Sequence, residues 1–207
     1  MSKSPPKTRL VVGSKNPHKV DEIRRMLAEL SVEVLDLSAF DVGDIPESGT
    51  TFEANAVIKA EGFARVTGLL TISDDSGLEI DVLGGEPGVY SARFAGRQGD
   101  DAANNALVLE RLKGLEDGER AARFRCVIAL ASPEGLILTS QGHVEGRIAH
   151  EERGDYGFGY DPLFIPEGFD QTFGELGQEV KDSISHRSRA LSAFRRAFER
   201  YLSKSGR

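Results

Sequence analysis

The chain has 207 residues and a formal net charge of −7, with 39% hydrophobic and 29% charged residues. This length predicts one large domain, or one domain of two lobes, and the composition is typical of a soluble globular protein. The acidic balance argues against sequence-independent binding of DNA or RNA, which needs a basic face. We therefore expect no nucleic-acid partner, and we expect a local basic cluster to bind any phosphate-bearing ligand.

Cysteine content and hydropathy narrow the class further. Cys126 is the only cysteine and lies in an apolar run, which predicts a core residue and excludes a disulfide framework or a cysteine-based metal site. No apolar stretch approaches the ~18 residues of a membrane span, and residues 1–7 contain no signal-peptide core. We expect a cytoplasmic protein with no membrane partner, frayed ends at 1–7 and 203–207, and one domain over 8–202.

The first part of the chain predicts alternating strands and helices. Asn16 is suited to cap a helix that starts at Pro17, and Gly68 is suited to end a second helix, for which Thr50 and Glu53 have capping-box spacing. In chain order we expect a strand at Arg9–Gly13, a helix at Pro17–Leu30, a strand at Val32–Leu37, a helix at Phe52–Thr67 and a strand-like run at Leu69–Ile72.

The rest of the chain predicts a long hairpin between helices. We expect a half-exposed strand at Leu78–Leu83, a helix at Ala102–Leu112, hairpin strands at Arg123–Ala131 and Leu136–Ile148, and a final helix at Ser188–Leu202. Because strands and helices interleave early and a hairpin follows, the predicted fold is α/β, with helices covering a mixed β-sheet.

Two adjacent acidic residues, Asp74 and Asp75, follow the strand-like run and are expected at a strand end. Two such carboxylates repel one another unless a cation or a proton lies between them. Glu47, in the loop before the second helix, could supply a third carboxylate, and Mg²⁺ takes one or two carboxylates together with phosphate oxygens and waters. The alternative is a solvated acidic turn.

Basic residues crowd the start of the first helix. Lys15, His18 and Lys19 lie where the helix macrodipole disfavours cations. The arrangement is favourable if an anion is bound there, since backbone N–H and ammonium groups would converge on it. The alternative is a set of solvated basic side chains. The segment differs from a P-loop, because it lacks the glycine spacing and the terminal Lys-Ser/Thr pair.

Three further segments carry polar or aromatic residues, and the first two have two interpretations each. Thr51, Asn55 and Lys59 form one stripe of the second helix, which is either its solvent face or a face that reaches into a cleft. Phe158 or Tyr160, flanked by glycines, could stack on a base or could be core residues of a tight turn. The segment Lys181–Arg187 predicts a basic turn before the last helix, by itself a weak signal.

These segments, taken in order, resemble the ITP/XTP pyrophosphatase family, over nearly the whole chain from Leu10 to Phe198. The family's Thr-Gly-Asn-x-x-Lys-x-x-Glu pattern is similar to the segment from Ser14 to Glu22. The remaining motifs are Phe52 to Ala60, Asp74 to Leu78, Leu83-Gly84-Gly85, Pro87-Gly88, Tyr90-Ser91-Ala92-Arg93, Phe158-Gly159-Tyr160-Asp161-Pro162 and Ser185-His186-Arg187. The clearest departure is Ser14-Lys15 in place of the usual Thr-Gly.

The resemblance implies a role for each matched residue. The triphosphate would be cradled by Ser14, Lys15, Asn16, Pro17, His18, Lys19 and Lys59. Glu47 and Asp75 would hold Mg²⁺ with support from Asp74, and Asp75 would also be the general base. The base and the rest of the substrate would be contacted by Phe158, Gly159, Tyr160, Asp161, Lys181, His186, Arg187, Asn55, Ser76 and Arg93.

The resemblance also implies an activity and an architecture. The expected activity is Mg²⁺-dependent hydrolysis of ITP, dITP and XTP to the monophosphate and pyrophosphate, which removes non-standard purines from the nucleotide pool. The expected fold is a long twisted mixed sheet with helices, in two lobes with the active-site cleft between them, and the expected assembly is a homodimer. Two alternatives stay open: a Maf-like pyrophosphatase acting on pyrimidine or modified nucleotides, and a nucleotide-binding regulatory module without turnover.

Overall fold

The computed structural model describes residues 8–205, which form a six-stranded sheet of order β2-β1-β3-β4-β5-β6. The strands are β1 (Thr8–Val12), β2 (Val32–Asp36), β3 (Leu70–Ile80), β4 (Ala121–Ser132), β5 (Gly135–Ile148) and β6 (Phe164–Pro166). Strand β1 is parallel to both β2 and β3, whereas β6 is antiparallel to β5. The sheet is therefore mixed, and the predicted α/β fold is confirmed.

The α-helices of the described residues are α1 (Pro17–Leu27), α2 (Phe52–Thr67), α3 (Asp101–Arg111), α4 (Gln178–Ile184) and α5 (His186–Ser205). Short 3₁₀ helices occur at Leu37–Ala39, Asp81–Leu83, Gly88–Arg93 and Asp117–Glu119. The Asn16 side chain caps α1 as predicted, and Gly68 ends α2 in a left-handed conformation with φ of 67°. The N-cap of α2 is Thr51, which accepts from the Ala54 N–H, rather than Thr50.

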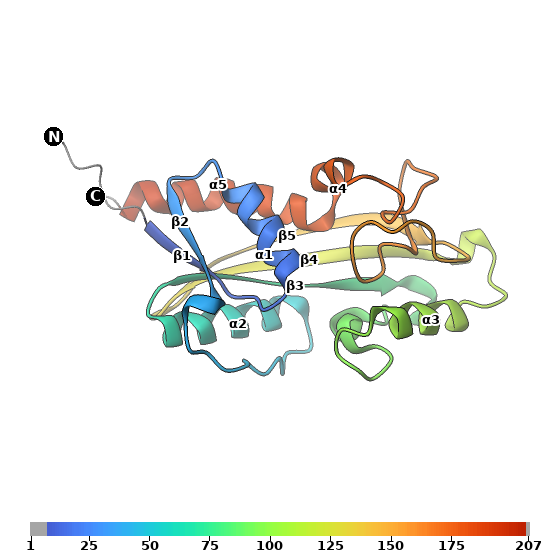
Figure 1. Cartoon of the computed structure of the whole chain (residues 1–207), viewed down its shortest axis with the longest axis horizontal. Coiled ribbons are helices and arrows are strands. Elements are labelled where there is room, and N and C mark those ends of the chain that lie inside the picture. The colour runs from blue at the N-terminus through green and yellow to red at the C-terminus, as the bar shows by residue number, and fades with distance from the viewer. Residues whose placement is uncertain (1–7, 206–207) are drawn as a thin grey trace. The chain divides into compact units, whose positions relative to one another are not determined.

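The chain divides into two compact units. The first contains the described residues up to Asp75, Val127–Ser140, and the described residues from Leu191 onward. The second contains Ser76–Cys126 and Gln141–Ala190. Within the first unit, Figure 1 shows α2 on one face of the sheet and α1 with α5 on the other.

Close contact between β1 and β3 organises the first unit. A Cβ atom on Gly13 would lie 2.2 Å from the Ser73 Oγ and 2.9 Å from the Phe63 ring, so only glycine fits there. The Ser73 hydroxyl donates to the Gly13 carbonyl at 3.0 Å. Val11, Leu37 and Phe63 form a buried cluster beside this contact, which holds α2 against the sheet.

The second unit has an aromatic core and a buried arginine. The rings of Phe124 and Phe164 lie 4.7 Å apart, centroid to centroid. Arg120 is 2% exposed and donates hydrogen bonds to three backbone carbonyls, those of Leu112, Ile148 and Ala149. Burial lowers the pKa of the Arg120 guanidinium, which nevertheless stays charged at neutral pH. This one side chain ties the end of α3 to the end of β5.

Several predicted boundaries were wrong for identifiable reasons. Strand β3 runs without a break from Leu70 to Ile80, so Asp74 and Asp75 lie inside a strand and not at its end. Both carboxylates have partly buried cationic partners, which make an interior position tolerable. The predicted basic turn before the last helix is instead helix α4, Ser185, and the first turn of α5.

The helix ends also differ from the prediction. Helix α1 ends at Leu27, three residues early, and α5 extends past the expected end at Leu202 to Ser205. The expected tail at 203–207 is therefore helical up to residue 205; residues 206–207, like the expected tail at 1–7, lie outside the described part.

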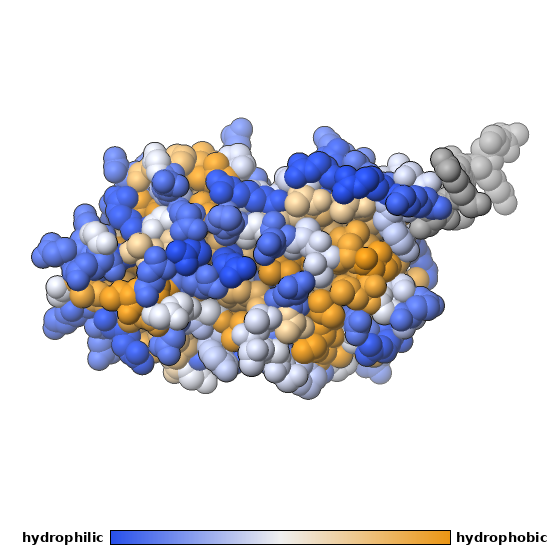
Figure 2. All heavy atoms as spheres, turned by 180° about the vertical axis from the view of Figure 1, so that it is seen from behind, coloured by the Kyte–Doolittle hydropathy of each residue, from blue (hydrophilic) through white to orange (hydrophobic). Residues whose placement is uncertain are grey.

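The surface mixes polar and apolar residues. Figure 2 shows hydrophilic and hydrophobic residues interspersed on the face turned to the viewer. Large apolar side chains that are more than 40% exposed are Val66, Val82, Tyr90, Leu136 and Tyr156. Within residues 8–205, none of the helices combines the length and the apolar character that crossing a membrane requires.

Replacing Arg120 by methionine should lower the free energy of unfolding by about 3 kcal/mol, because three buried carbonyls lose their donor. Denaturant titration of the purified variant measures this change. Arg125→Met is the matched control, since Arg125 is 41% exposed in its side chain and pairs with Glu79 at 3.4 Å at the surface. It should change stability by less than about 1 kcal/mol, and equal losses in both variants would contradict the clamp role of Arg120.

Candidate active site

Consecutive residues of β3 place two carboxylates toward different helices. Neighbouring side chains of a strand point to opposite faces of the sheet. Asp74 accordingly pairs with Lys19 of α1 at 3.0 Å, whereas Asp75 pairs with Lys59 of α2 at 3.0 Å. The side chain of Asp74 is fully buried and that of Asp75 is 9% exposed. The first unit therefore holds two buried or nearly buried carboxylate–lysine pairs on adjacent residues.

The Lys59 ammonium lies between two carboxylates. Its Nζ is 3.0 Å from the Glu47 Oε1 and 3.0 Å from the Asp75 Oδ1. Glu47 comes from the loop before α2, so the structure brings together three residues that the sequence separates. Of the predicted polar stripe on α2, Asn55 and Lys59 face β3 and contact Asp75, whereas Thr51 at its start is exposed.

Burial and charge act in opposite directions on these groups. Burial raises the pKa of Asp75, although Lys59 and Lys19 act to lower it. Burial disfavours the Lys59 ammonium, but Asp75, Asp74 and Glu47 together outweigh that effect and raise the pKa of Lys59. The result is a lysine that stays charged beside a carboxylate that takes up a proton more readily than an ordinary aspartate.

Asn55 holds the Glu47 loop and Asp75 in one arrangement. Its side chain is fully buried; Oδ1 accepts from the Gly49 N–H at 2.8 Å, and Nδ2 donates to the Asp75 Oδ2 at 3.2 Å. The sequence predicted that Asn55 contacts substrate. In the structure, both ends of the amide bind within the protein, and they connect the loop that contains Glu47 to Asp75. A contact between Asn55 and substrate stays a prediction.

The predicted phosphate cradle is a tight turn leading into α1. The Ser14 Oγ accepts from the Asn16 N–H at 3.2 Å, and the Asn16 Oδ1 accepts from the N–H groups of His18 and Lys19. Pro17 and His18 are exposed, and the Lys19 side chain is 16% exposed. Polar side chains thus already satisfy part of the helix N-terminus, while Lys19 lies beside Asp74.

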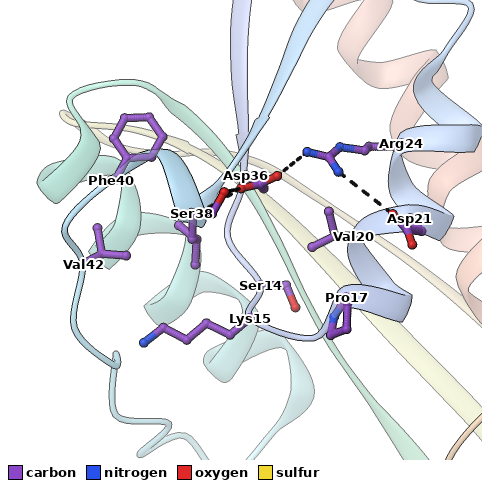
Figure 3. A pocket seen from close by; sticks show the side chains of 11 residues that line it. Ser14, Lys15, Pro17, Val20, Asp21, Arg24, Asp36, Ser38, Phe40 and Val42 are labelled. Carbon is purple, nitrogen blue, oxygen red and sulfur yellow. Dashed lines mark hydrogen bonds and ion pairs between the residues drawn. The ribbon is translucent and has the colours of Figure 1, made fainter.

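A pocket of about 430 Å³ lies on the face of α1 opposite Lys19. Figure 3 shows Arg24 paired with Asp36 and Asp21 at its wall, and Lys15 extending along its edge. The Lys15 Nζ binds the Asp44 carboxylate at 2.7 Å. The charged side chains of this wall are therefore paired within the protein, and Lys15 is directed to the loop that also contains Glu47.

A second polar group surrounds Phe158 in the second unit. Asp161 and Lys181 form a buried ion pair at 2.5 Å, and the Asp161 Oδ2 also accepts from the Phe158 N–H at 2.8 Å. The Lys181 Nζ and the Arg187 Cζ lie 4.6 Å and 5.6 Å from the centre of the Phe158 ring. The structure thereby brings together a half-buried aromatic ring, two cations and a carboxylate.

Other predicted base-contacting residues have partners within the second unit. The His186 ring stacks on Phe124 at 4.7 Å between centroids, and Arg187 donates to the Ser76 hydroxyl at 3.0 Å. Tyr160 is 4% exposed, and its hydroxyl donates to the Ser91 carbonyl at 2.8 Å. Burial raises the pKa of Tyr160 far above its ordinary value. Of the two aromatic candidates, Phe158 is the half-buried one and Tyr160 is a core residue.

Arg93 packs on an aromatic neighbour in the second unit. Its guanidinium packs over the Tyr90 ring, 5.2 Å from the ring centre, in the 3₁₀ helix at Gly88–Arg93. The sequence prediction that Arg93 contacts substrate stays a prediction.

Sequence reasoning missed two residues of α3. Asp101 accepts from the Gly159 N–H at 2.7 Å, and Asn105 donates to the Gly159 carbonyl at 3.2 Å. A signal was present: asparagine is a poor helix former, yet Asn104 and Asn105 stand together in the middle of a predicted helix. Such residues inside a helix indicate side chains that are used for hydrogen bonding.

The fold and these two groups define an α/β protein whose polar site is built on consecutive residues of a central strand. The chain belongs to the Ham1 family, whose family model matches residues 10–197. This membership confirms the resemblance drawn from the sequence motifs.

Individual relatives cover nearly the whole chain. A dITP/XTP pyrophosphatase of Bacillus subtilis is 48% identical over 91% of this chain and 96% of the relative. That of Desulforamulus reducens is 50% identical over 88% and 92%. Among solved structures, a Ham1 protein from Coxiella burnetii has a TM-score of 0.86 and 40% identity, covering 93% of this chain and 99% of that one. The Staphylococcus aureus Ham1 protein gives a TM-score of 0.83 and 37% identity, covering 93% and 98%.

Asp75→Asn should raise the free energy of unfolding at pH 7 by about 1 kcal/mol, because an amide is less costly to bury than a carboxylate whose pKa burial raises. The folded protein binds a proton on the Asp75 carboxylate more tightly than the unfolded chain does, because the pKa of this group is near 3.8 in the unfolded chain. Ionised Asp75 therefore lowers the free energy of unfolding at neutral pH. This loss disappears as the pH falls through the pKa of Asp75 in the folded protein to below 3.8.

Urea titrations of both proteins at several pH values test this dependence. The stability gain should be largest at neutral pH and absent at the acid end. Asp44→Asn serves as a control, because the Asp44 side chain is 89% exposed and its loss should change stability little at any pH. A less stable Asp75→Asn protein at pH 7 would show that the ion pair with Lys59 outweighs the burial of Asp75.

Proposed function

We propose that this chain hydrolyses non-canonical purine nucleoside triphosphates, namely ITP, dITP and XTP, to the monophosphate and pyrophosphate. The observation that carries the proposal is the convergence of Glu47, Lys59 and Asp75 in a chain of the Ham1 family. Relatives about half identical to it over about 90% of its length are named dITP/XTP pyrophosphatases. Removal of such nucleotides protects the nucleotide pool from non-standard purines.

We propose Mg²⁺ as the cofactor, held by Glu47 and Asp75. The donor set fits a hard divalent cation, because both carboxylates already converge on one cationic group, the Lys59 ammonium. Within residues 8–205 no group of three or more His, Cys, Asp or Glu side chains is placed to hold a metal. Two carboxylates suit an ion that is also bound by substrate phosphate oxygens. When bound, Mg²⁺ supplies charge stabilisation to the phosphates.

The chain's own residues supply the remaining chemistry. Asp75 accepts a proton from the attacking water, a task for which the raised pKa of this carboxylate is favourable. Lys19 and Lys59 provide positive charge for the phosphate oxygens and the pyrophosphate leaving group. Asn55 keeps Asp75 and the Glu47 loop aligned through its two hydrogen bonds.

The group around Phe158 is proposed to bind the base. The Phe158 ring offers a stacking surface, and Lys181 and Arg187 offer hydrogen-bond donors beside it. Donors facing the 6-position donate to the carbonyl oxygen of hypoxanthine or xanthine, whereas the amine of adenine is itself a donor and would leave them unpaired. This chemistry favours ITP over ATP.

The same features of the chain disfavour both alternatives that the sequence left open. Membership of the Ham1 family favours the purine-directed reading over a Maf-like enzyme. A regulatory binding module would gain nothing from a carboxylate whose pKa is raised beside a charged lysine. The resemblance also implies a homodimer, which sedimentation of the purified chain tests directly.

Wild-type protein with Mg²⁺ and ITP should release IMP and pyrophosphate, with no IDP. A panel of ITP, dITP, XTP, ATP, CTP and UTP, analysed by ion-exchange chromatography, measures both products and selectivity. In ¹⁸O-water the label should appear in IMP, since we expect water to attack the α-phosphorus. IDP with orthophosphate would overturn the reaction, label in pyrophosphate would move the attack to the β-phosphorus, and faster turnover of pyrimidines would favour the Maf-like alternative.

Variants of residues that contact the phosphates and variants of residues that contact the base should change kcat/KM in different ways. Lys19→Gln should lower kcat/KM for every triphosphate by a similar factor, because phosphate oxygens carry no base identity. Arg187→Met should lower kcat/KM for ITP about tenfold more than for ATP, since a lost charged hydrogen bond affects only the base that uses it. Steady-state kinetics on both substrates, with circular dichroism to verify folding, measures the ratio. Equal losses in the Arg187 variant would make Arg187 a structural or phosphate-contacting residue.

A further inference from the structure

Gly159 lies in the middle of the loop formed by residues 158–161, and α3 binds both of its backbone polar groups. Its N–H donates to the Asp101 Oδ2 at 2.7 Å, and its carbonyl accepts from the Asn105 Nδ2 at 3.2 Å. Asp101 and Asn105 are four residues apart and therefore lie on one face of the helix. The peptide units on both sides of Gly159 are thus fixed by one rigid element.

The conformation of Gly159 makes this contact selective. Its φ of 63° is in the left-handed region, which glycine adopts without strain. Because glycine adopts positive and negative φ about equally readily, this residue has other accessible backbone conformations. The hydrogen bonds on both sides of Gly159 select one of them. The neighbouring residues are also fixed, because the Phe158 N–H is bound by Asp161 and the Tyr160 hydroxyl by Ser91.

Within residues 8–205, the side-chain amide of Asn105 forms hydrogen bonds through its N–H donors, not through its oxygen. Asn105 is 3% exposed, and its Nδ2 donates both to Gly159 and to the Glu152 carboxylate at 3.2 Å. Its Oδ1 is buried with no hydrogen-bond partner among the described residues. A buried unpaired oxygen is destabilising. The side chain therefore carries a cost to stability, which an apolar residue of similar size would avoid, and its evident use is the pair of donated bonds.

We propose that Asp101 and Asn105 are positioning residues that set base selectivity by fixing the orientation of Phe158. The ring follows directly from the backbone at Gly159, and Lys181 and Arg187 pack over it. Loosening Gly159 therefore moves the ring relative to both cations. This inference rests on the function proposed above, in which Phe158, Lys181 and Arg187 bind the base.

Kinetics on ITP and ATP test the effect on selectivity. Asp101→Ala and Asn105→Leu should each lower the ratio of kcat/KM for ITP to that for ATP about tenfold, mainly through a higher KM for ITP. Asp101→Asn keeps an acceptor oxygen and should restore the ratio to within about twofold of wild type. The matched control is Asp100→Ala, which removes the cap of the same helix (the Ala103 N–H to Asp100 contact at 3.2 Å) without touching Gly159. It should lower the unfolding midpoint and leave the ratio unchanged.

Amide hydrogen exchange of the protein without nucleotide gives a readout that does not depend on activity. The Gly159 amide should exchange at least about tenfold faster in Asp101→Ala than in wild type or in Asp100→Ala, because only that variant removes its acceptor. Faster exchange with an unchanged ratio, or equal losses on ITP and ATP, overturns the selectivity role. A wild-type protein that hydrolyses no triphosphate overturns the proposed function instead, and unchanged exchange in Asp101→Ala overturns the contact itself.

Discussion

Two consecutive carboxylates buried inside β3 are the constraint on which the first unit depends. A buried carboxylate without a cation is strongly destabilising, so each must meet its own positive charge. Because their side chains point to opposite faces of the sheet, one lysine must come from α1 and the other from α2. This requirement fixes which face of each helix lies against β3, and the loop before α2 brings the Glu47 carboxylate to the same lysine as Asp75.

The second unit repeats the pattern with a different outcome. The Asp161–Lys181 pair is buried, and its charges are used to fix a loop and to flank an aromatic ring. Buried ion pairs contribute little net stability compared with apolar residues of similar shape, but they restrict the arrangement of the side chains around them. In both units, buried ion pairs stand where apolar residues would have given more stability. Their effect is to hold polar side chains at defined positions.

Sequence patterns predicted helices α1, α2, α3 and α5, the hairpin and the residues that meet around Lys59 and Phe158, because periodicity, caps and the family motifs are local signals. They did not predict that Asp74 and Asp75 lie inside one continuous strand, since the acidic Asp74–Gly77 segment looks like a turn. The seven-residue helix α4 and the three-residue strand β6 were too short to give a periodic signal. The hydrogen bonds from α3 to Gly159 join Asp101 and Asn105 to a residue 58 and 54 positions away. No local sequence pattern indicates contacts over such separations.

The parallel pairing of β1 with both β2 and β3 also governs how the chain can fold. Parallel neighbours need a crossover connection, and the Ser73–Gly13 hydrogen bond closes a loop of 60 residues. Loop closure of this length must occur before the sheet contacts can compensate for its entropy, so assembly of this region is intrinsically slow. The hairpin of β4 and β5 has no such delay. A nascent chain would therefore expose the Asp74–Lys19 and Asp75–Lys59 partners to water until late in folding, when the sheet closes around them.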